Sequence, residues 1–260
     1  HQTTWLQIAG DRLGCNIDGL ELGKGDTDRV PFGIGTWGSR SLSTAGMAVA
    51  VASDKVTVKA KMLAGHMLEC APDDIEISDS MVSVKGTDRT LSYAEVADAA
   101  YHRGDRPEGL EIGLEETHFY DPTDCNYPSA IHICVVLVDA DTGGVTLRDY
   151  WAVDDVGTLV NPMIVEGQIH GGLVQGIGQA LMEDCAYDPE TGQMRAATFM
   201  DYAMPRADDL PYFVTEITEV PSGANPLGIK PGSEGGTAPA PAVVTNAIVD
   251  ALAGLGVRHI

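Results

Sequence analysis

Hydrophobic residues recur along the chain with two periods, one typical of helices and the other typical of strands. A spacing of three to four predicts helices over residues 1–13, 47–70, 91–104, 162–183 and 241–252. Alternation and β-prone composition predict strands at residues 17–22, at two places within 75–85, and at 110–120, 131–139, 145–154, 198–202 and 213–219. The turn at residues 141–144 is expected to join two of these strands as an antiparallel hairpin.

Capping residues mark the ends of several predicted helices. Gly14 follows the first helix as a C-cap would, and Ser92 with Glu95 has the spacing of a capping box. Asn161 before Pro162 supplies a cap and then proline at the first helical position. Strands and helices alternate irregularly rather than as βαβ units, so the sequence predicts an α+β fold with packed helices and mixed sheets.

Composition and charge exclude several classes of partner. The chain has 260 residues, 44% hydrophobic content and a formal net charge of -22, which argues against nucleic acid or an anionic membrane as a partner. We find no secretory signal pattern and expect neither a membrane span nor a location outside the cytoplasm. The five cysteines are scattered, with no CxxC pair, and are interpreted as reduced thiols. His118 and His132 have no second ligand at metal spacing, so we expect no protein metal site and read both as packed or surface histidines.

Residues 225–246 hold one carboxylate, Glu234, between glycines and prolines just ahead of a predicted helix. Glycine lets backbone approach a ligand closely or adopt positive φ, and proline stiffens the path. Two interpretations follow from this segment. Glu234 is either a reactive group that the loop aims at a ligand, or an acidic residue stabilised by the helix dipole.

A second loop, residues 33–46, precedes the helix predicted over 47–70. It contains Gly38, Ser39, Arg40 and Ser41, a composition typical of anion sites at helix starts. Ordinary N-capping by Ser41 or Ser43 explains the serines equally well.

The helix predicted over 162–183 is rich in glycine, and each interior glycine costs about 1 kcal/mol against alanine. One face carries Gln168, Gly172, Gln175 and Gln179, while Ile169, Leu173, Ile177 and Leu181 are available to a core. Close helix packing explains the glycines without a ligand, and a molecule bound against the amide stripe is the other explanation. The run GGLVQGIG is not interpreted as a dinucleotide fingerprint, because it lies inside a helix instead of a strand-to-helix turn.

Five ordered blocks across nearly the whole chain resemble the large, molybdenum-binding subunit of the molybdenum hydroxylases, the family of xanthine oxidase, aldehyde oxidase and carbon monoxide dehydrogenase. The blocks are HQTTWLQIAGDRLG, GDTDRVPFGIGTWGSRS, VDDVGTLVNPMIVEGQIHGGLVQGIGQAL, TFMDYAMPRADDLP and NPLGIKPGSEGGTAPAPAVVTNAIVDAL. The resemblance implies the C-terminal half of that subunit, with two related cofactor-binding subdomains at about 1–125 and 126–260. It also implies a fragment of a longer chain.

The resemblance assigns roles to particular residues. Glu234 matches the catalytic glutamate of the family, and Gln168 matches a glutamine that contacts the cofactor near the metal. Gly38, Ser39, Arg40 and Ser41 match the loop that holds the pterin and its phosphates, and Gly232 and Ser233 belong to the cofactor segment beside the base. Ser233 stands where many members have glycine, so the local backbone geometry is expected to differ. The pterin itself holds molybdenum in this family.

The resemblance further implies a reaction and partners. Glu234 would deprotonate a metal-bound hydroxyl that attacks a substrate carbon, with water supplying the oxygen. Electrons would leave through 2Fe–2S and FAD groups on partner subunits, in an oligomer of the heteromeric unit that includes the missing N-terminal half. The cofactor is expected to be molybdenum-molybdopterin, with the cytosine dinucleotide form left open. The fragment alone is expected to be inactive, and the alternative function is an acidic binding module that kept the fold without turnover.

Overall fold

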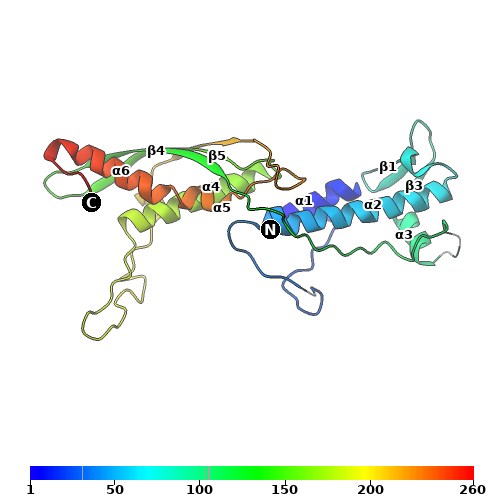
Figure 1. The fold of residues 1–260 in the computed structure, drawn as a ribbon, viewed down its shortest axis with the longest axis horizontal. Helices are drawn as coiled ribbons and strands as arrows, with labels where there is room; N and C mark the ends of the chain where they lie inside the picture. Colours follow the sequence, from blue (N-terminus) through cyan, green and yellow to red (C-terminus); the bar gives the residue numbers. More distant parts are fainter. Residues whose placement is uncertain (31, 103, 105) are drawn as a thin grey trace. The chain divides into compact units, whose positions relative to one another are not determined.

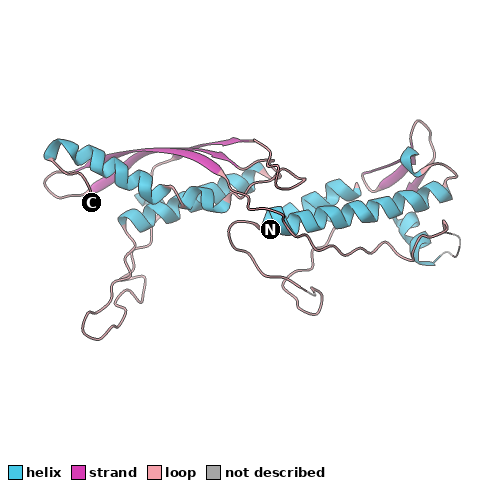
Figure 2. Cartoon of the chain, viewed as in Figure 1, coloured by secondary structure: helices cyan, strands magenta, loops and turns pink. Residues whose placement is uncertain are grey.

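The chain forms two compact units, His1–Thr123 and Asp124–Ile260, each with its own hydrophobic core. The computed structural model describes residues 1–30, 32–102, 104 and 106–260. Figure 1 traces both units along the chain, and Figure 2 shows their helices, strands and connecting loops. That both units are related cofactor-binding subdomains stays a prediction.

The first unit packs three helices with a small antiparallel sheet. Its helices are α1 (Gln2–Leu13), α2 (Met47–Met67) and α3 (Tyr93–His102), and its strands are β1 (Ile75–Ser78), β2 (Met81–Val84) and β3 (Thr90–Ser92). The strand order is β1-β2-β3, with both pairs antiparallel. A π-helical turn, η2 (Leu42–Gly46), precedes α2. Leu63, Ile75, Val82 and Val96 are fully buried in the core of this unit.

The second unit covers a mixed three-stranded sheet with helices. Its strands are β4 (Ser129–Val138), β5 (Val145–Asp155) and β6 (Phe213–Thr218), and its helices are α4 (Pro162–Leu181), α5 (Ser233–Thr237) and α6 (Ala240–Leu252). Strand β5 lies in the middle, antiparallel to β4 and parallel to β6. The predicted α+β class with mixed sheets is therefore confirmed.

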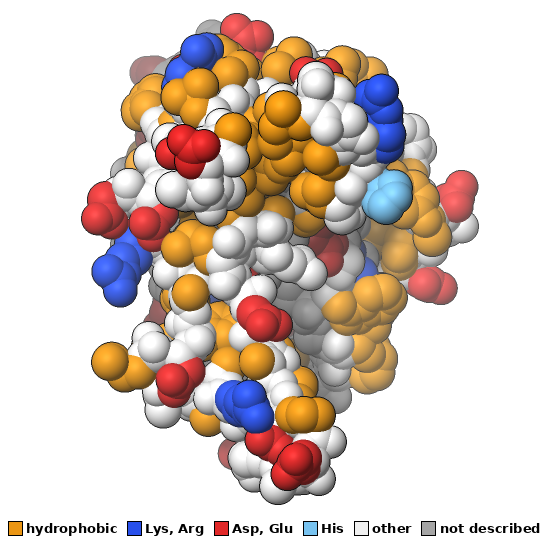
Figure 3. All heavy atoms as spheres, turned by 90° about the vertical axis from the view of Figure 1, so that its left-hand side faces the viewer, with side chains coloured by type: hydrophobic (Ala, Val, Ile, Leu, Met, Phe, Trp, Pro, Cys, Tyr) orange, Lys and Arg blue, Asp and Glu red, His pale blue; other side chains and the backbone are white. Residues whose placement is uncertain are grey.

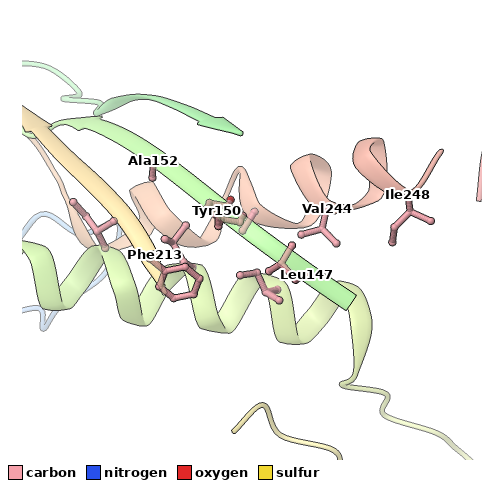
Figure 4. Packing of buried hydrophobic residues seen from close by; sticks show 10 residues of the cluster. Leu147, Tyr150, Ala152, Phe213, Val244 and Ile248 are labelled. Atoms are coloured by element: carbon pink, nitrogen blue, oxygen red, sulfur yellow. The ribbon is translucent and has the colours of Figure 1, made fainter. Parts of the chain in front are cut away.

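One face of this sheet builds the core of the second unit. Tyr150 and Phe213, from neighbouring strands, meet edge to face with ring centroids 5.8 Å apart. Figure 4 shows them with Leu147 from β5 and Val244 from α6 in one packed layer. The positions predicted for the core face of α4 join this layer: Ile169, Leu173 and Ile177 are buried and Leu181 is partly buried. This packing fixes α4 and α6 on the sheet, and α5 lies between them in sequence and contacts both.

The predicted caps are confirmed. Gly14 ends α1 in the left-handed conformation, with φ 68°. The Ser92 backbone N–H donates to Glu95 and the Glu95 N–H donates back to the Ser92 hydroxyl, which is the capping box. Asn161 accepts a hydrogen bond from Ile164 N–H, with Pro162 at the first helical position.

Three predicted strands are wrong, and all their residues are described. Residues 17–22 begin with a 3-10 turn, in which Asn16 Oδ1 accepts from Asp18 N–H. Residues 198–202 form a turn closed by Thr198, whose carbonyl accepts from Tyr202 N–H. Residues 110–120 run as an extended loop with a turn at Gly113 and no pairing strand. A strand needs a neighbour to hydrogen-bond, and these alternating segments have none.

One segment contradicts the expectation that no apolar stretch is long enough to cross a membrane. Ser233–Leu255, 23 residues, meets that test by length and composition alone. It is weak evidence for a span, since the segment is divided between α5 and α6 and Val244 and Ile248 of α6 pack into the core. Apolar side chains do reach the surface on the side of the second unit where the β4–β5 turn lies, with acidic groups scattered among them (Figure 3).

Candidate functional site

A pocket of about 370 Å³ lies between α4 and α5 in the second unit. It contains three of the residues to which the family resemblance assigned roles, Gln168, Ser233 and Glu234. The other lining residues are Gly167, Gly171, Gly172, Gln175 and Thr237. Residues 65 positions apart in sequence, on α4 and α5, thus share one polar concave surface.

Helices α4 and α5 pack backbone against backbone. A Cβ at Gly172 would lie 2.9 Å from Thr237 N, and one at Gly236 would lie 2.5 Å from the Ile169 carbonyl oxygen. Atoms do not approach so closely, so glycine is required on both sides of the contact. Further along α4, a Cβ at Gly176 would lie 2.7 Å from the Ala240 Cβ.

Two other glycines of α4 are not in contact with a neighbouring element. A Cβ at Gly167 or Gly171 would meet nothing within 4 Å, and both residues line the pocket. The two explanations offered for the glycine-rich helix therefore apply to different residues. Gly172 and Gly176 permit close packing, whereas Gly167 and Gly171 present bare backbone to the pocket.

Side-chain hydrogen bonds order the pocket wall. The Ser233 hydroxyl donates to Gln168 Oε1 at 2.6 Å. The Thr237 hydroxyl lies 3.2 Å from both the Gly172 carbonyl oxygen and Gln175 Oε1. The backbone of Ser233 does not have positive φ, and Ser233 begins the helical turn α5. A side chain is therefore accommodated there without backbone strain.

Glu234 lies in the first turn of α5 and not, as predicted, in a loop ahead of the helix. It is exposed and lines the pocket, and the buried Gly235 and Gly236 follow it. Residues 225–246 contain Gly228, Gly232, Gly235 and Gly236, and of these only Gly228 has positive φ, at 70°. Gly235 and Gly236 are required for space instead.

The segment before Glu234 is fastened to the end of β5. A Cβ at Gly157 would lie 2.2 Å from the Gly228 carbonyl oxygen, and Lys230 N–H donates to the Val156 carbonyl at 2.8 Å. Lys230 Nζ also donates to Asp155 Oδ2, in a pair whose side chains are 15% and 12% exposed. These contacts hold the chain three to four residues ahead of the pocket.

The Asp155 carboxylate is satisfied on both oxygens. Its Oδ1 accepts from Gly157 N–H and Val220 N–H, each at 3.0 Å. Burial raises the pKa of Asp155, but Lys230 and the two N–H donors lower it further, so the pKa lies below its ordinary value. The ion pair is therefore formed at neutral pH.

In the loop of the first unit, residues 33–46, one arginine side chain is stacked on an aromatic ring. The Arg40 guanidinium lies over the Trp37 ring, 4.1 Å from its centroid, and Arg40 Nε is buried without a hydrogen-bond partner among the described residues. Gly38 and Ser39 both have positive φ, 58° and 52°, which is uncommon for serine. Functional loops hold such conformations more often than ordinary connections do.

The capping alternative for this loop receives no support. Ser41 has helical backbone angles and makes no cap hydrogen bond, and its hydroxyl lies 2.7 Å from that of Thr36. The Ser43 hydroxyl donates to the Arg40 carbonyl instead. Gly38, Ser39, Arg40 and Ser41 all belong to the first unit, whereas Gln168, Gly232, Ser233 and Glu234 belong to the second.

Sequence reasoning missed several residues at this site. Thr237 closes the pocket and Lys230 anchors the chain that leads to it. The pair Asp154-Asp155 carried the clearest signal in the sequence, because two carboxylates that directly follow the apolar run Tyr150–Val153 require partners if they are buried.

A family model for the molybdopterin cofactor-binding domain matches residues 1–211. The chain belongs to this family. Its resemblance to the molybdenum hydroxylases is thereby confirmed, and the relatives are proteins of that kind. The large chain of carbon monoxide dehydrogenase from Hydrogenophaga pseudoflava is 41% identical over 100% of this chain and 32% of its own length. The large subunit of nicotine 6-hydroxylase from Paenarthrobacter nicotinovorans is 38% identical over 98% of this chain and 32% of its own length.

Solved structures agree with this family assignment. The crystal structure of the Cu,Mo-CO dehydrogenase in its carbon monoxide reduced state matches with a TM-score of 0.90 and 40% identity, over 100% of this chain and 32% of that one. Quinoline 2-oxidoreductase from Pseudomonas putida 86 matches with the same TM-score of 0.90 and the same identity of 40%. This match covers 98% of this chain and 33% of that one. The chain thus spans about a third of the length of these relatives.

The residues present fit a pterin cofactor. Gly167 and Gly171 leave open space that any side chain would occupy, next to amide and hydroxyl groups that bind polar ring edges. The buried Arg40 Nε is a donor that still lacks an acceptor in the described part of the chain, as an anion-binding group would. Within the described residues, no group of three or more His, Cys, Asp or Glu side chains is arranged to hold a metal ion.

Proposed function

We propose that this chain is the molybdopterin-binding, base-supplying part of a molybdenum hydroxylase that oxidises a substrate carbon with water-derived oxygen. The observation that carries the proposal is the α4–α5 pocket, where Glu234 lies beside Gln168 and bare glycine backbone. Family membership over residues 1–211 supports the same cofactor. The activity belongs to the whole protein, of which this chain corresponds to about a third of the relatives' length.

The two units contribute different binding groups. In the second unit, Gln168 and Ser233 present an ordered amide and hydroxyl to the polar edge of the pterin. Gly232, which has no side chain, directly precedes Ser233 in the chain. In the first unit, Ser39, Arg40 and Ser41 supply donors for phosphate, with the Arg40 plane held against Trp37.

Glu234 acts as the general base. The bound cofactor supplies a Lewis-acidic metal and accepts the electrons of the oxidation. The Glu234 carboxylate takes the proton from the water-derived nucleophile as it attacks the substrate carbon, a role that contributes about 10²- to 10⁴-fold in typical enzymes. The rigid backbone around it keeps the carboxylate directed at the pocket.

The substrate and partners follow from the same chemistry. The relatives named above act on carbon monoxide, nicotine and quinoline by their names, so the substrate is a small molecule with an electrophilic carbon. Electrons pass to FAD and 2Fe–2S partners, and the assembled enzyme is a heteromeric oligomer in the cytoplasm. The cofactor is molybdenum-molybdopterin, with the cytosine dinucleotide as one candidate form.

The decisive variant is Glu234→Gln in the complete enzyme. Glutamine keeps the size of the side chain but cannot accept the proton, so turnover is expected to fall about 10²-fold or more while molybdenum content stays unchanged. Glu216→Gln, an exposed residue of β6, makes the same change away from the pocket and should retain turnover. Near-normal turnover of the Glu234 variant would reject the base. Complete protein without molybdenum, from a host that makes the cofactor, would favour the inactive binding module.

A further inference from the structure

A buried polar group lies beneath the helix that carries Glu234, and the mechanism above does not use it. His132 of β4 and Asp154 of β5 pair at 3.4 Å between Nε2 and Oδ2, with side chains 0% and 1% exposed. His132 Nδ1 is hydrogen-bonded to the Tyr150 hydroxyl at 3.0 Å. Tyr150 and Asp154 lie on the same face of β5, the face that builds the core.

This group is incompletely satisfied. His132 Nε2 and both oxygens of Asp154 are buried without a hydrogen bond at normal geometry among the described residues. A buried carboxylate costs several kcal/mol unless it is well paired, and a 3.4 Å contact to one imidazole is a weak pairing. Replacing a whole buried pair of this kind with apolar residues is often neutral or stabilising, so a contribution to stability does not by itself explain why Asp154 and His132 are present.

The Asp154 carboxylate lies close to the backbone beside the base, where it leaves no room for a side chain. A Cβ at Gly235 would lie 2.9 Å from Asp154 Oδ1, and Gly235 directly follows Glu234. On the opposite side, Gly236 is pressed against the Ile169 carbonyl oxygen and Leu173 N of α4. The first turn of α5 is therefore held between a carboxylate of the sheet and the backbone of α4.

We propose that Asp154, itself held by His132 and Tyr150, is a positioning residue for Glu234. Its carboxylate supports the Gly235 backbone from the core side. This support directs the base toward the pocket. Geometry near 1 Å matters at this point, because displacing a reacting group by that distance costs about 10²-fold in rate.

The contact is tested by a double-mutant cycle in the complete enzyme. Asp154→Ala removes the support, and Gly235→Ala introduces a methyl group that meets Asp154 Oδ1. Each single variant is expected to lose on the order of ten-fold in kcat per bound molybdenum with KM within about two-fold. In the double variant, the cost of Gly235→Ala should largely disappear, because the atom it strikes is gone. Additive losses would overturn the proposal.

A second measurement does not depend on activity. Amide hydrogen exchange of residues 233–237 should increase in Asp154→Ala, since the support under α5 is removed, while the exchange of α4 stays unchanged. Asp149→Ala, on the same strand but paired with Arg148 at the surface, should alter neither exchange nor kcat. Unchanged exchange of residues 233–237 would contradict the support. If Asp154→Ala loads molybdenum poorly, Gly235→Ala alone still provides the test. Faster exchange of residues 233–237 in that variant would support the proposal, and native exchange would contradict it.

The inference rests on Glu234 being the base. Failure of the base assignment and failure of the positioning role are distinguishable. If Glu234 is not the base, Glu234→Gln remains active, whatever the effect of Asp154→Ala. A wrong positioning role appears as full turnover and native exchange in Asp154→Ala while Glu234→Gln stays inactive.

Discussion

At the scale of single residues, the pocket depends on the ion pair of Lys230 with Asp155, here called the anchor, although neither residue lines the pocket. Lys230 and Asp155 join the chain ahead of Glu234 to the central strand, and Asp155 also accepts two backbone N–H groups. The pair is mostly buried, so removing one partner leaves an uncompensated charge inside the second unit. Stability and site geometry are therefore coupled through one carboxylate.

The anchor predicts a specific pH dependence. The pKa of Asp155 lies below its ordinary value of 3.8 in the folded state, so its stabilisation is complete above that value. It is lost as pH falls through the lower, folded-state pKa. Lys230→Met should reduce the free energy of unfolding by about 2 kcal/mol or more at pH 7, and the reduction should become smaller as pH falls below the ordinary carboxyl range toward 3. Urea unfolding of the 260-residue chain at both pH values measures the difference.

A surface pair provides the control for that experiment. Arg148→Met breaks a pair with Asp149 in which the arginine side chain is 57% exposed, and such pairs contribute about 0–1 kcal/mol. Equal losses for the two variants, or a Lys230→Met effect that does not change with pH, would show that the Asp155 pair is not the anchor.

At the scale of elements, α4 combines two uses of glycine along one helix. Gly176 allows α6 to approach, and Gly171 faces the pocket. Alanine at these two positions changes the same atoms and the same helix propensity. The variants therefore separate packing from ligand space.

Gly176→Ala and Gly171→Ala should change stability in opposite directions. The first places a methyl group 2.8 Å from the Thr237 carbonyl oxygen and should cost about 1–3 kcal/mol. The second meets no atom and should add up to about 1 kcal/mol by helix propensity, while lowering molybdenum content because it narrows the pocket. Thermal unfolding of the chain and metal analysis of the complete enzyme measure both. A stabilised Gly176→Ala variant, or native molybdenum content in Gly171→Ala, would contradict this division.

The elements also show what the sequence could predict. Helices and the β4–β5 hairpin follow from local rules, so Gly14, Ser92 and Asn161 marked their ends correctly. Strands at residues 110–120 failed because pairing is a long-range property that alternation does not contain. Gln168 and Ser233 were predicted as separate site residues, yet their hydrogen bond depends on how α5 packs on α4. Asp154 was missed for the same reason, since its role depends on Gly235, 81 positions later in the sequence.

At the scale of the whole molecule, the sheet of the second unit has a second apolar face. Side chains that alternate with the core positions point to solvent from all three strands, and Ile131 and Ile133 are 71% and 59% exposed. The other exposed members of this outer face are Leu137, Trp151, Val153 and Val214. Ile133 pairs with Trp151 across β4 and β5, and Trp151 pairs with Val214 across β5 and β6, so the patch is continuous.

The apolar outer face favours association between copies of the chain. The net charge of -22 acts against association, because it makes the copies repel one another in dilute buffer. Continuous apolar patches on soluble proteins mark sites of association, and salt screens charge repulsion over about 10 Å at 0.1 M. The 260-residue chain is therefore expected to self-associate increasingly as salt rises from about 0.02 to 0.5 M. Light scattering after size exclusion measures the mass at each salt concentration.

Ile133→Glu should abolish most of the increase in mass with salt, since it places a charge in the centre of the patch. Met200→Glu should not abolish it, because Met200, whose exposed fraction is 92%, lies outside the three strands of the sheet. A chain that stays monomeric at high salt, or equal effects of the two substitutions, would mean that the outer face does not drive association.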